Sequence, residues 1–247
     1  MEGLKEALEY TVNLSTPHYK EVDGVLFSDK TMYEMRKEIP KATPLEMRTL
    51  TGLLDYIKSE SDVMAPYMFI HVKSPTEVEL YAQLDENRGR EKLVSVSAMI
   101  PEFRFGYWYP SEEFIIHVMS KFIDGNAELI NDKDKILKFA GTSQAGTVAD
   151  YGDDGISQKV SVQKTVTSRE EDIVPNPVHL TPFRTFLEVE QPSSDFIFRM
   201  RGDGGICAAL YEADGGAWKL DAIKNIKDYL EKQLKDISTK TIFTIIA

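Results

Sequence analysis

The sequence predicts an α+β protein built from mostly antiparallel sheet with flanking amphipathic helices. Apolar segments joined by short turns, such as the two halves of residues 67–84, favour hairpins and antiparallel pairing. Single segments with helical apolar spacing, at 111–124 and 222–234, lie between groups of such strands. Because these helices do not alternate regularly with strands, a parallel βαβ array is not expected.

In the first hundred residues, the apolar periodicity and turn residues place each element. Leu4, Ala7 and Leu8 share one helical face, and Ser74-Pro75-Thr76 is a typical turn between two strands. The expected elements are a short helix from Leu4 to Val12, a strand at 22–27 with Asp23-Gly24 as a turn, a helix begun by Thr51 and ended near Ser59, strands at 67–73 and 77–84, and a third strand from Leu93.

Residues 103–109 alternate aromatic side chains with others, which predicts an extended segment with four aromatics on one face. Ser111 follows as the expected N-cap of a helix that ends at Asp124, before Gly125. A second helix or an irregular stretch is expected over 127–140, with Gly141 as its stop.

The polar, Gly-rich stretch 142–155 is the expected boundary of the chain. It separates an N-terminal α+β region, 1–141, from a C-terminal one, 156–247, unless the chain is one continuous domain. The C-terminal part is expected to contain strands at 160–166, 186–190, 196–200 and 206–211, an exposed charged segment at 168–172, a tight turn at 202–205, a helix opened by Asp214-Gly215-Gly216, and a final strand at 242–246.

The composition narrows the class of protein. The 247 residues carry 29 Lys or Arg and 40 Asp or Glu, a formal net charge of −11, which disfavours binding to nucleic-acid phosphates. No apolar run approaches the roughly 20 residues of a membrane span. The acidic segment 1–12 does not resemble a signal peptide. The only cysteine, Cys207, leaves no disulfide framework. A cytoplasmic protein is therefore expected.

No catalytic residue, metal site or cofactor is expected from the motifs. The histidines are far apart and in no metal-binding pattern: His18, His71, His117 and His179. No Gly-x-Ser-x-Gly occurs, and Cys207 lies in an apolar segment, where a thiol is usually inert. Asp150, Asp153 and Asp154 are an acidic cluster, for which a solvated turn is the favoured interpretation over a metal-dependent hydrolase. The protein is therefore expected not to be an enzyme.

Three surfaces are candidates for binding. Aromatic side chains next to an arginine can stack the bases of a single strand, although burial under the following helix is the favoured interpretation. Arginines beside a Gly-rich turn can hold an anion, although a hairpin turn is favoured. An apolar final strand can extend the sheet of another chain. The residues are Phe103, Arg104, Phe105, Tyr107 and Trp108; Arg199, Arg201, Gly204 and Gly205; and Ile242, Phe243 and Ile245.

Several segments resemble the YfdQ-like family of phage and prophage proteins of unknown function. They are Thr49-Leu-Thr-Gly-Leu-Leu-Asp-Tyr-Ile57, Phe69-Ile-His-Val-Lys-Ser-Pro-Thr-Glu-Val78, Pro101-Glu-Phe-Arg-Phe105, Ser111-Glu-Glu-Phe-Ile115, Asp153-Asp-Gly155, Phe186-Leu-Glu-Val-Glu-Gln-Pro192 and Phe196-Ile-Phe-Arg199. None of them is catalytic. The resemblance implies a phage or prophage gene expressed inside the bacterial host, and it brings no activity and no functional residue.

The leading hypothesis is a non-enzymatic cytosolic phage protein that acts through homo-oligomeric assembly or by binding host or phage macromolecules. One alternative is an accessory single-stranded DNA-binding protein of phage recombination or replication, although the net charge of −11 disfavours nucleic acid as a partner. Another is a counter-defence protein that sequesters a host immune effector or a nucleotide signal. A membrane partner is not expected.

Overall fold

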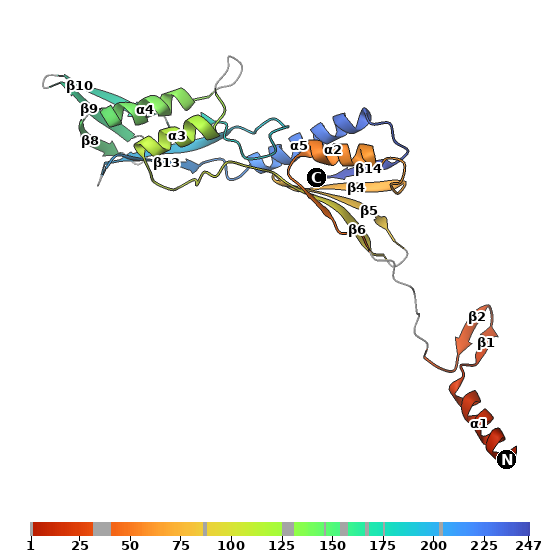
Figure 1. Cartoon of the computed structure of the whole chain (residues 1–247). Coiled ribbons are helices and arrows are strands. Elements are labelled where there is room, and N and C mark those ends of the chain that lie inside the picture. Colours follow the sequence, from red (N-terminus) through yellow and green to blue (C-terminus); the bar gives the residue numbers. More distant parts are fainter. Residues whose placement is uncertain are drawn as a thin grey trace. The chain divides into compact units, whose positions relative to one another are not determined.

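The computed structural model describes residues 2–31, 41–85, 88–124, 131–145, 147–153, 158–165, 168–174, 176–202 and 205–247, with the backbone alone for 142–174. It has the mixed α+β architecture with antiparallel-rich sheets that the sequence predicts (Figure 1). The chain divides into two compact units, Met1–Lys41 and Ala42–Ala247, here called unit 1 and unit 2. The boundary expected at 142–155 is a different position and stays a prediction.

Unit 1 contains one helix and one hairpin. Helix α1 spans Glu2–Ser15, and strands β1 (Tyr19–Val22) and β2 (Val25–Ser28) pair antiparallel. Asp23 (φ 51°) and Gly24 (φ 77°) form the two-residue turn that was predicted. No residue of these three elements is buried. The unit therefore has secondary structure but no core of its own in the residues described.

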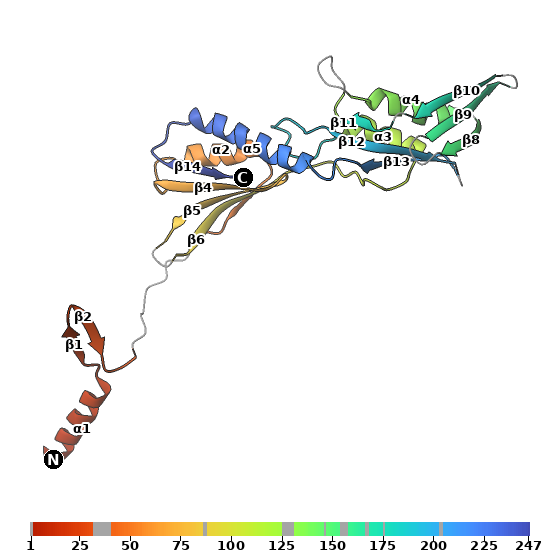
Figure 2. The ribbon, with the colours of Figure 1, turned by 180° about the vertical axis from the view of Figure 1, so that it is seen from behind.

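Unit 2 contains a five-stranded sheet in the order β14-β4-β5-β6-β3. The strands are β3 (Leu45–Met47), β4 (Tyr67–Ser74), β5 (Glu77–Leu84), β6 (Arg90–Ser97) and β14 (Ile242–Ile246). The central pairs are antiparallel, and the two edge strands pair parallel to their neighbours. Helices α2 (Leu50–Ser59) and α5 (Trp218–Lys235) cover one face, as Figure 2 shows.

Apolar side chains between these helices and the sheet form what we call the first core. Its fully buried residues include Leu53 and Ile57 of α2, Ile70 of β4, Leu80 of β5 and Ile226 of α5. On β4 the buried residues alternate with residues of the opposite face, as expected for a sheet covered on one side. The hairpin of β4 and β5 and the helix after Asp214 confirm the sequence predictions.

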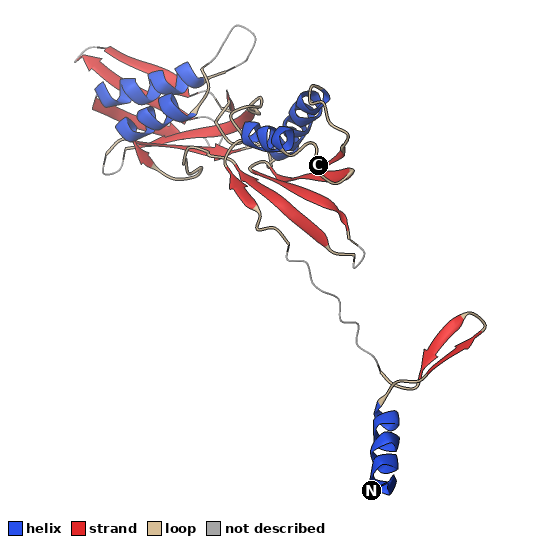
Figure 3. Ribbon diagram, turned by 45° about the vertical axis from the view of Figure 1, so that its right-hand side comes forward, coloured by secondary structure: helices blue, strands red, loops and turns tan. Residues whose placement is uncertain are grey.

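A second, four-stranded sheet has the order β11-β12-β13-β7. Its strands are β7 (Tyr109–Pro110), β11 (Val178–Leu180), β12 (Ser194–Arg201) and β13 (Cys207–Glu212). Helices α3 (Ser111–Lys121) and α4 (Lys133–Ala145) pack on it and enclose the second core, which includes Phe114, Ile136 and Phe198 (Figure 3). A further antiparallel sheet consists of β8 (Thr147–Asp153), β9 (Gln158–Thr165) and β10 (Ser168–Val174).

The prediction of an extended aromatic segment over 103–109 is wrong. Only Tyr109 belongs to a strand, and the preceding residues form a loop with a turn at Gly106, whose φ is +78°. The Gly106 N–H donates to the Leu210 carbonyl at 2.7 Å, which anchors the turn on β13. The alternating aromatic residues therefore belong to a loop, and Phe103 and Phe105 of this loop pack against the second core.

Several helix ends and loops also differ from expectation. Thr49, not Thr51, caps α2, because its Oγ1 accepts from the Gly52 N–H at 3.1 Å. The Ser111 hydroxyl does not cap α3 but donates to the Ala140 carbonyl at 2.8 Å. Helix α4 continues past Gly141, and Gly125 lies outside the described residues.

Three stretches have a different secondary structure from the one expected. The expected polar loop 142–155 contains the end of α4 and strand β8, and the expected exposed segment 168–172 lies in β10. The strand expected at 186–190 is a turn. Among the described helices, none has the length and apolar character needed to cross a bilayer.

Candidate functional site

The predicted aromatic platform is divided between the core and the surface. The Phe103 ring stacks on Tyr109 with centroids 5.2 Å apart, and the Phe105 ring stacks on Phe196 at 5.1 Å. Both rings pack against the second core, whereas Tyr107 is exposed. The structure therefore does not present Phe103 and Phe105 as free stacking surfaces for bases.

A small pocket of about 310 Å³ lies beside this loop. It is lined by Glu102, Arg104, Tyr107, Tyr109, Glu113, His117 and Lys121. Arg104 forms an ion pair with Glu102 at 3.0 Å, and the His117 ring lies within hydrogen-bonding distance of Glu113 at 3.2 Å. Acidic and basic groups are balanced, so the lining selects neither an anion nor a cation.

The predicted anion-binding turn is only partly described. Arg199 and Arg201 lie two residues apart on β12 and share one face of the strand. The Arg201 guanidinium lies 4.6 Å from the centroid of the Trp108 ring, so it is held by an aromatic face. Gly205 has a φ of +130°, and Gly204 lies outside the described residues.

The acidic cluster lies on the third sheet. Asp150 and Asp153 belong to β8, and Asp154 lies outside the described residues. Within the part of the chain that the structure describes, no three His, Cys, Asp or Glu side chains lie together as a metal ion would require.

The sequence analysis did not identify a buried arginine, Arg184, which contacts the loop before β12, the end of β13 and the start of α5. Arg184 is only 5% exposed. Its Nη1 donates to Glu212 Oε1 at 3.0 Å, and its Nη2 donates to the Pro192 carbonyl at 3.1 Å and to Ser194 Oγ at 2.5 Å. The guanidinium also lies 4.1 Å from the Trp218 ring centroid. This set of contacts holds the loop 181–193 in place.

The Arg184 side chain stays charged despite its burial. The pKa of Arg184 is lowered to about 10, because burial outweighs the opposite effect of the carboxylates of Glu212 and Asp214. At neutral pH the guanidinium is therefore protonated and serves as a fixed cation. Nothing in its sequence neighbours marks it as buried, because an isolated Arg is usually a surface residue.

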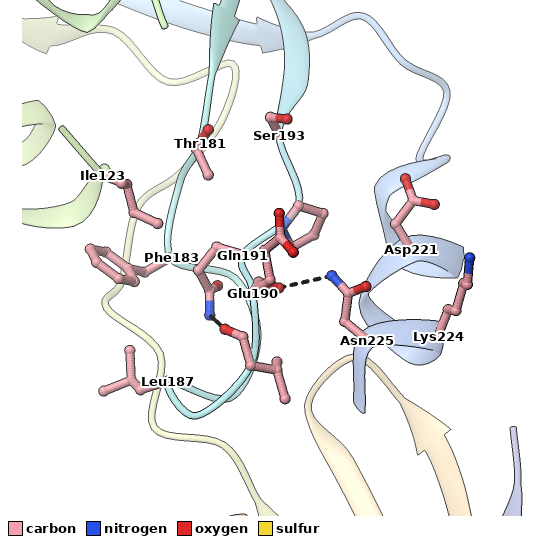
Figure 4. Close-up of a pocket in the computed structure, with 12 residues that line it drawn as sticks. Ile123, Thr181, Phe183, Leu187, Glu190, Gln191, Ser193, Asp221, Lys224 and Asn225 are labelled. Atoms are coloured by element: carbon pink, nitrogen blue, oxygen red, sulfur yellow. Dashed lines mark hydrogen bonds between the residues drawn. The ribbon is translucent and has the colours of Figure 1, made fainter. Parts of the chain in front are cut away.

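A cavity of about 420 Å³ lies between the loop 181–193 and the first half of α5 (Figure 4). The Asn225 Nδ2 donates to the Glu190 carbonyl at 3.0 Å, which fixes the loop on the helix. The remaining lining residues are Ile123, Thr181, Phe183, Leu187, Val189, Gln191, Pro192, Ser193, Asp221 and Lys224. The lining mixes apolar groups with one basic and two acidic side chains.

Asp214 connects the Arg184 contacts to the start of α5. Burial raises the pKa of Asp214, but hydrogen bonds from Ser194 Oγ and from the N–H groups of Gly216 and Trp218 outweigh it. The net pKa of Asp214 is lowered. Asp132 behaves alike: burial raises its pKa, but hydrogen bonds from the His179 N–H and from Lys135 outweigh this effect, so that its net pKa is lowered. Both carboxylates are thus stabilised in the charged form.

These two carboxylates predict acid-sensitive folding. A folded-state pKa below the unfolded value of about 3.9 adds stability above that pH, and the stability is lost as the pH falls through the folded pKa. We expect the urea midpoint of the full chain to fall between about pH 5 and about pH 2. In the double variant Asp132→Asn/Asp214→Asn this fall should be smaller. An unchanged pH dependence in that variant would contradict the assignment.

The predicted oligomer edge is a sheet edge. Strand β14 is the outermost strand of the five-stranded sheet and pairs parallel with β4. Ile242 is 55% exposed, whereas Phe243 and Ile245 pack against the first core. The three residues are therefore brought together on one strand, but on opposite faces of it.

The comparisons with known proteins give no relative from which a function can be carried over. No family model, no curated protein and no solved structure matches the chain. The resemblance to the YfdQ-like family therefore stays a prediction. In the chain itself, the elements of unit 1 and the strand β14 carry large apolar side chains that are exposed.

Proposed function

We propose that this protein is a non-enzymatic protein of phage or prophage origin that works through homo-oligomeric assembly. The observation that carries the proposal is the apolar surface of unit 1. Every large apolar side chain of α1 and the β1–β2 hairpin is exposed: Leu4, Leu8, Tyr10, Val12, Leu14, Tyr19, Val22, Val25, Leu26 and Phe27. Contiguous exposed apolar residues of this kind mark association surfaces.

Unit 1 needs a surface outside itself to be stable. Leu4, Leu8 and Val12 recur every four residues along α1, so they form an apolar stripe that unit 1 itself leaves exposed. A two-stranded hairpin is marginally stable in water, and a 14-residue helix is marginal as well. Full burial of a Leu, Val or Phe side chain contributes about 1.5–3 kcal/mol. Burial of a few of these side chains at an interface would therefore stabilise a helix and a hairpin that are only marginally stable alone.

The charge of unit 1 supports a second copy as the partner. Residues 1–41 contain 6 Lys or Arg and 8 Asp or Glu, a formal net charge of −2. The whole chain carries −11, so most of the repulsion between two copies resides in unit 2. Two copies can therefore approach through unit 1 with little electrostatic cost.

The alternative of single-strand binding has less support. Phe103 and Phe105 pack into the second core, which removes two rings from the proposed stacking surface. The counter-defence and hydrolase hypotheses stay predictions. Assembly is the hypothesis that accounts for the exposed apolar side chains of unit 1.

The test is the native mass of the full-length protein. We expect light scattering to give a mass above that of the 28.0 kDa chain. The ratio of absorbance at 260 and 280 nm should be that of a protein without nucleic acid. The double variant Leu8→Asp/Phe27→Asp should lower the mass, because it places charge on both apolar elements of unit 1. Asn13→Asp adds a charge at an exposed polar position of α1 and serves as the control. A monomeric wild-type chain at every concentration would overturn the proposal.

A further inference from the structure

The outer side of β14 is an edge without the usual protection against pairing. In the described residues no strand pairs with that side. Edge strands are commonly protected by charged side chains, Pro, a bulge or a short length. Residues 242–246 contain no charge, Pro or Gly, and their register with β4 is regular. The opposite edge, β3, is only three residues long and carries Glu46.

The exposed side chains of β14 form an apolar row on the sheet face away from α2 and α5. Ile242 is 55% and Ile246 46% exposed, and Thr244 lies between them on the same face. Tyr67, which pairs with Ile242 in the register, is 53% exposed and widens the row. The pattern of the row, Ile-Thr-Ile at 242, 244 and 246, is symmetric about Thr244.

A groove runs along the other face of the same edge. It has a volume of about 360 Å³ and is bounded by the last turns of α5, the connection to β14 and β14 itself. The apolar lining residues are Leu234, Ile237, Phe243 and Ile245. A strand added to this edge would therefore meet apolar side chains on both of its faces, and on the groove side also Glu231 and Lys235.

The charges favour a second copy of this chain as the added strand. In a chain of net charge −11, most pairs of surfaces from two copies repel each other. Residues 241–246 carry no charge, so two β14 strands can approach without repulsion along their length. Antiparallel pairing of β-branched side chains and Thr–Thr pairs across strands is favourable.

We propose that β14 strands from two copies pair antiparallel about a two-fold axis through Thr244, which joins two five-stranded sheets into one continuous sheet. This inference rests on the proposed assembly and adds an interface in unit 2 to the one proposed for unit 1. Thr244 then lies opposite the partner's Thr244, and Ile242 opposite the partner's Ile246. Such an interface is isologous, since each copy contributes the same strand.

The symmetry gives a register-specific cross-linking test in the full-length protein. In a Cys207→Ser background, Thr244→Cys should form covalent dimers on mild oxidation or with a short bifunctional maleimide, because a residue on the axis faces its own copy. Ile242→Cys and Ile246→Cys should cross-link when mixed and far less when alone. Glu46→Cys on the opposite edge is the matched control and should stay uncross-linked.

A second variant separates this inference from the proposed function. Thr244→Arg places like charges at the axis and should lower the native mass, with an unchanged far-ultraviolet circular dichroism spectrum. If the wild-type chain is oligomeric but Thr244→Cys does not cross-link and Thr244→Arg keeps the mass, the β14 interface is wrong and assembly stands. If the wild-type chain is a monomer, both proposals are wrong.

Discussion

Replacement of Arg184 by Leu is expected to lower the free energy of unfolding of the protein by about 3–5 kcal/mol. The guanidinium is 5% exposed and donates to Glu212, to the Pro192 carbonyl and to Ser194. Its loss leaves these acceptors without their donor in a region from which water is largely excluded. The Leu side chain also loses the contact of the guanidinium with Trp218.

Two further variants make the Arg184 test specific. Arg184→Lys keeps the charge but not the planar fork, so it should recover only part of the lost stability. Arg104→Gln is the control, because the Arg104 side chain is exposed and its pair with Glu102 is a surface ion pair. Urea denaturation followed by Trp fluorescence reports both, since Trp218 contacts Arg184. Equal midpoints for Arg184→Leu and Arg104→Gln would contradict the role given to the buried cation.

Phe114→Ala is expected to cost a similar amount, about 3–5 kcal/mol, by leaving a cavity in the second core. Phe114 lies on α3, is fully buried, and its ring stacks on Phe198 with centroids 5.6 Å apart. Rings on different elements limit how far the core can collapse around the gap.

A neighbouring residue of the same helix is the matched control for Phe114. Ile116 is 59% exposed, so Ile116→Ala removes apolar atoms that are already in contact with water. Its effect on the urea midpoint should correspond to about 0.5 kcal/mol or less. If both alanine variants unfold at the same urea concentration, Phe114 does not anchor the second core.

Local sequence signals predicted those elements in which side-chain spacing and turn chemistry agree. The hairpin of β4 and β5 has alternating apolar residues and a Ser-Pro-Thr turn, and α5 has a continuous apolar stripe. The prediction for 103–109 failed because aromatic residues at every second position also occur in a loop, which here turns at Gly106. The pattern around Ser111 predicts a helix cap, but its hydroxyl donates to the Ala140 carbonyl instead, a contact 29 residues away in the sequence.

The candidate surfaces were predicted unequally. The edge strand β14 could be predicted because it is a short, uncharged apolar run after a strong helix. The exposure of the apolar side chains of unit 1 could not, because an amphipathic helix and an apolar hairpin normally predict buried apolar side chains. Arg184 could not be predicted either, since its partners come from residues 8 to 34 positions further along the chain, from Pro192 to Trp218.

The segment that carries Arg184 has a consequence for how the protein opens and closes. Val178 and Leu180 belong to the second core, Phe186 and Val189 belong to the first, and Thr185 Oγ1 donates to the Pro75 carbonyl at the β4–β5 turn. Neither core is complete without this one stretch of chain, so local opening of either should expose amides in both. Unit 2 should therefore behave as a single foldon, with slow hydrogen exchange lost from both sheets in one cooperative event.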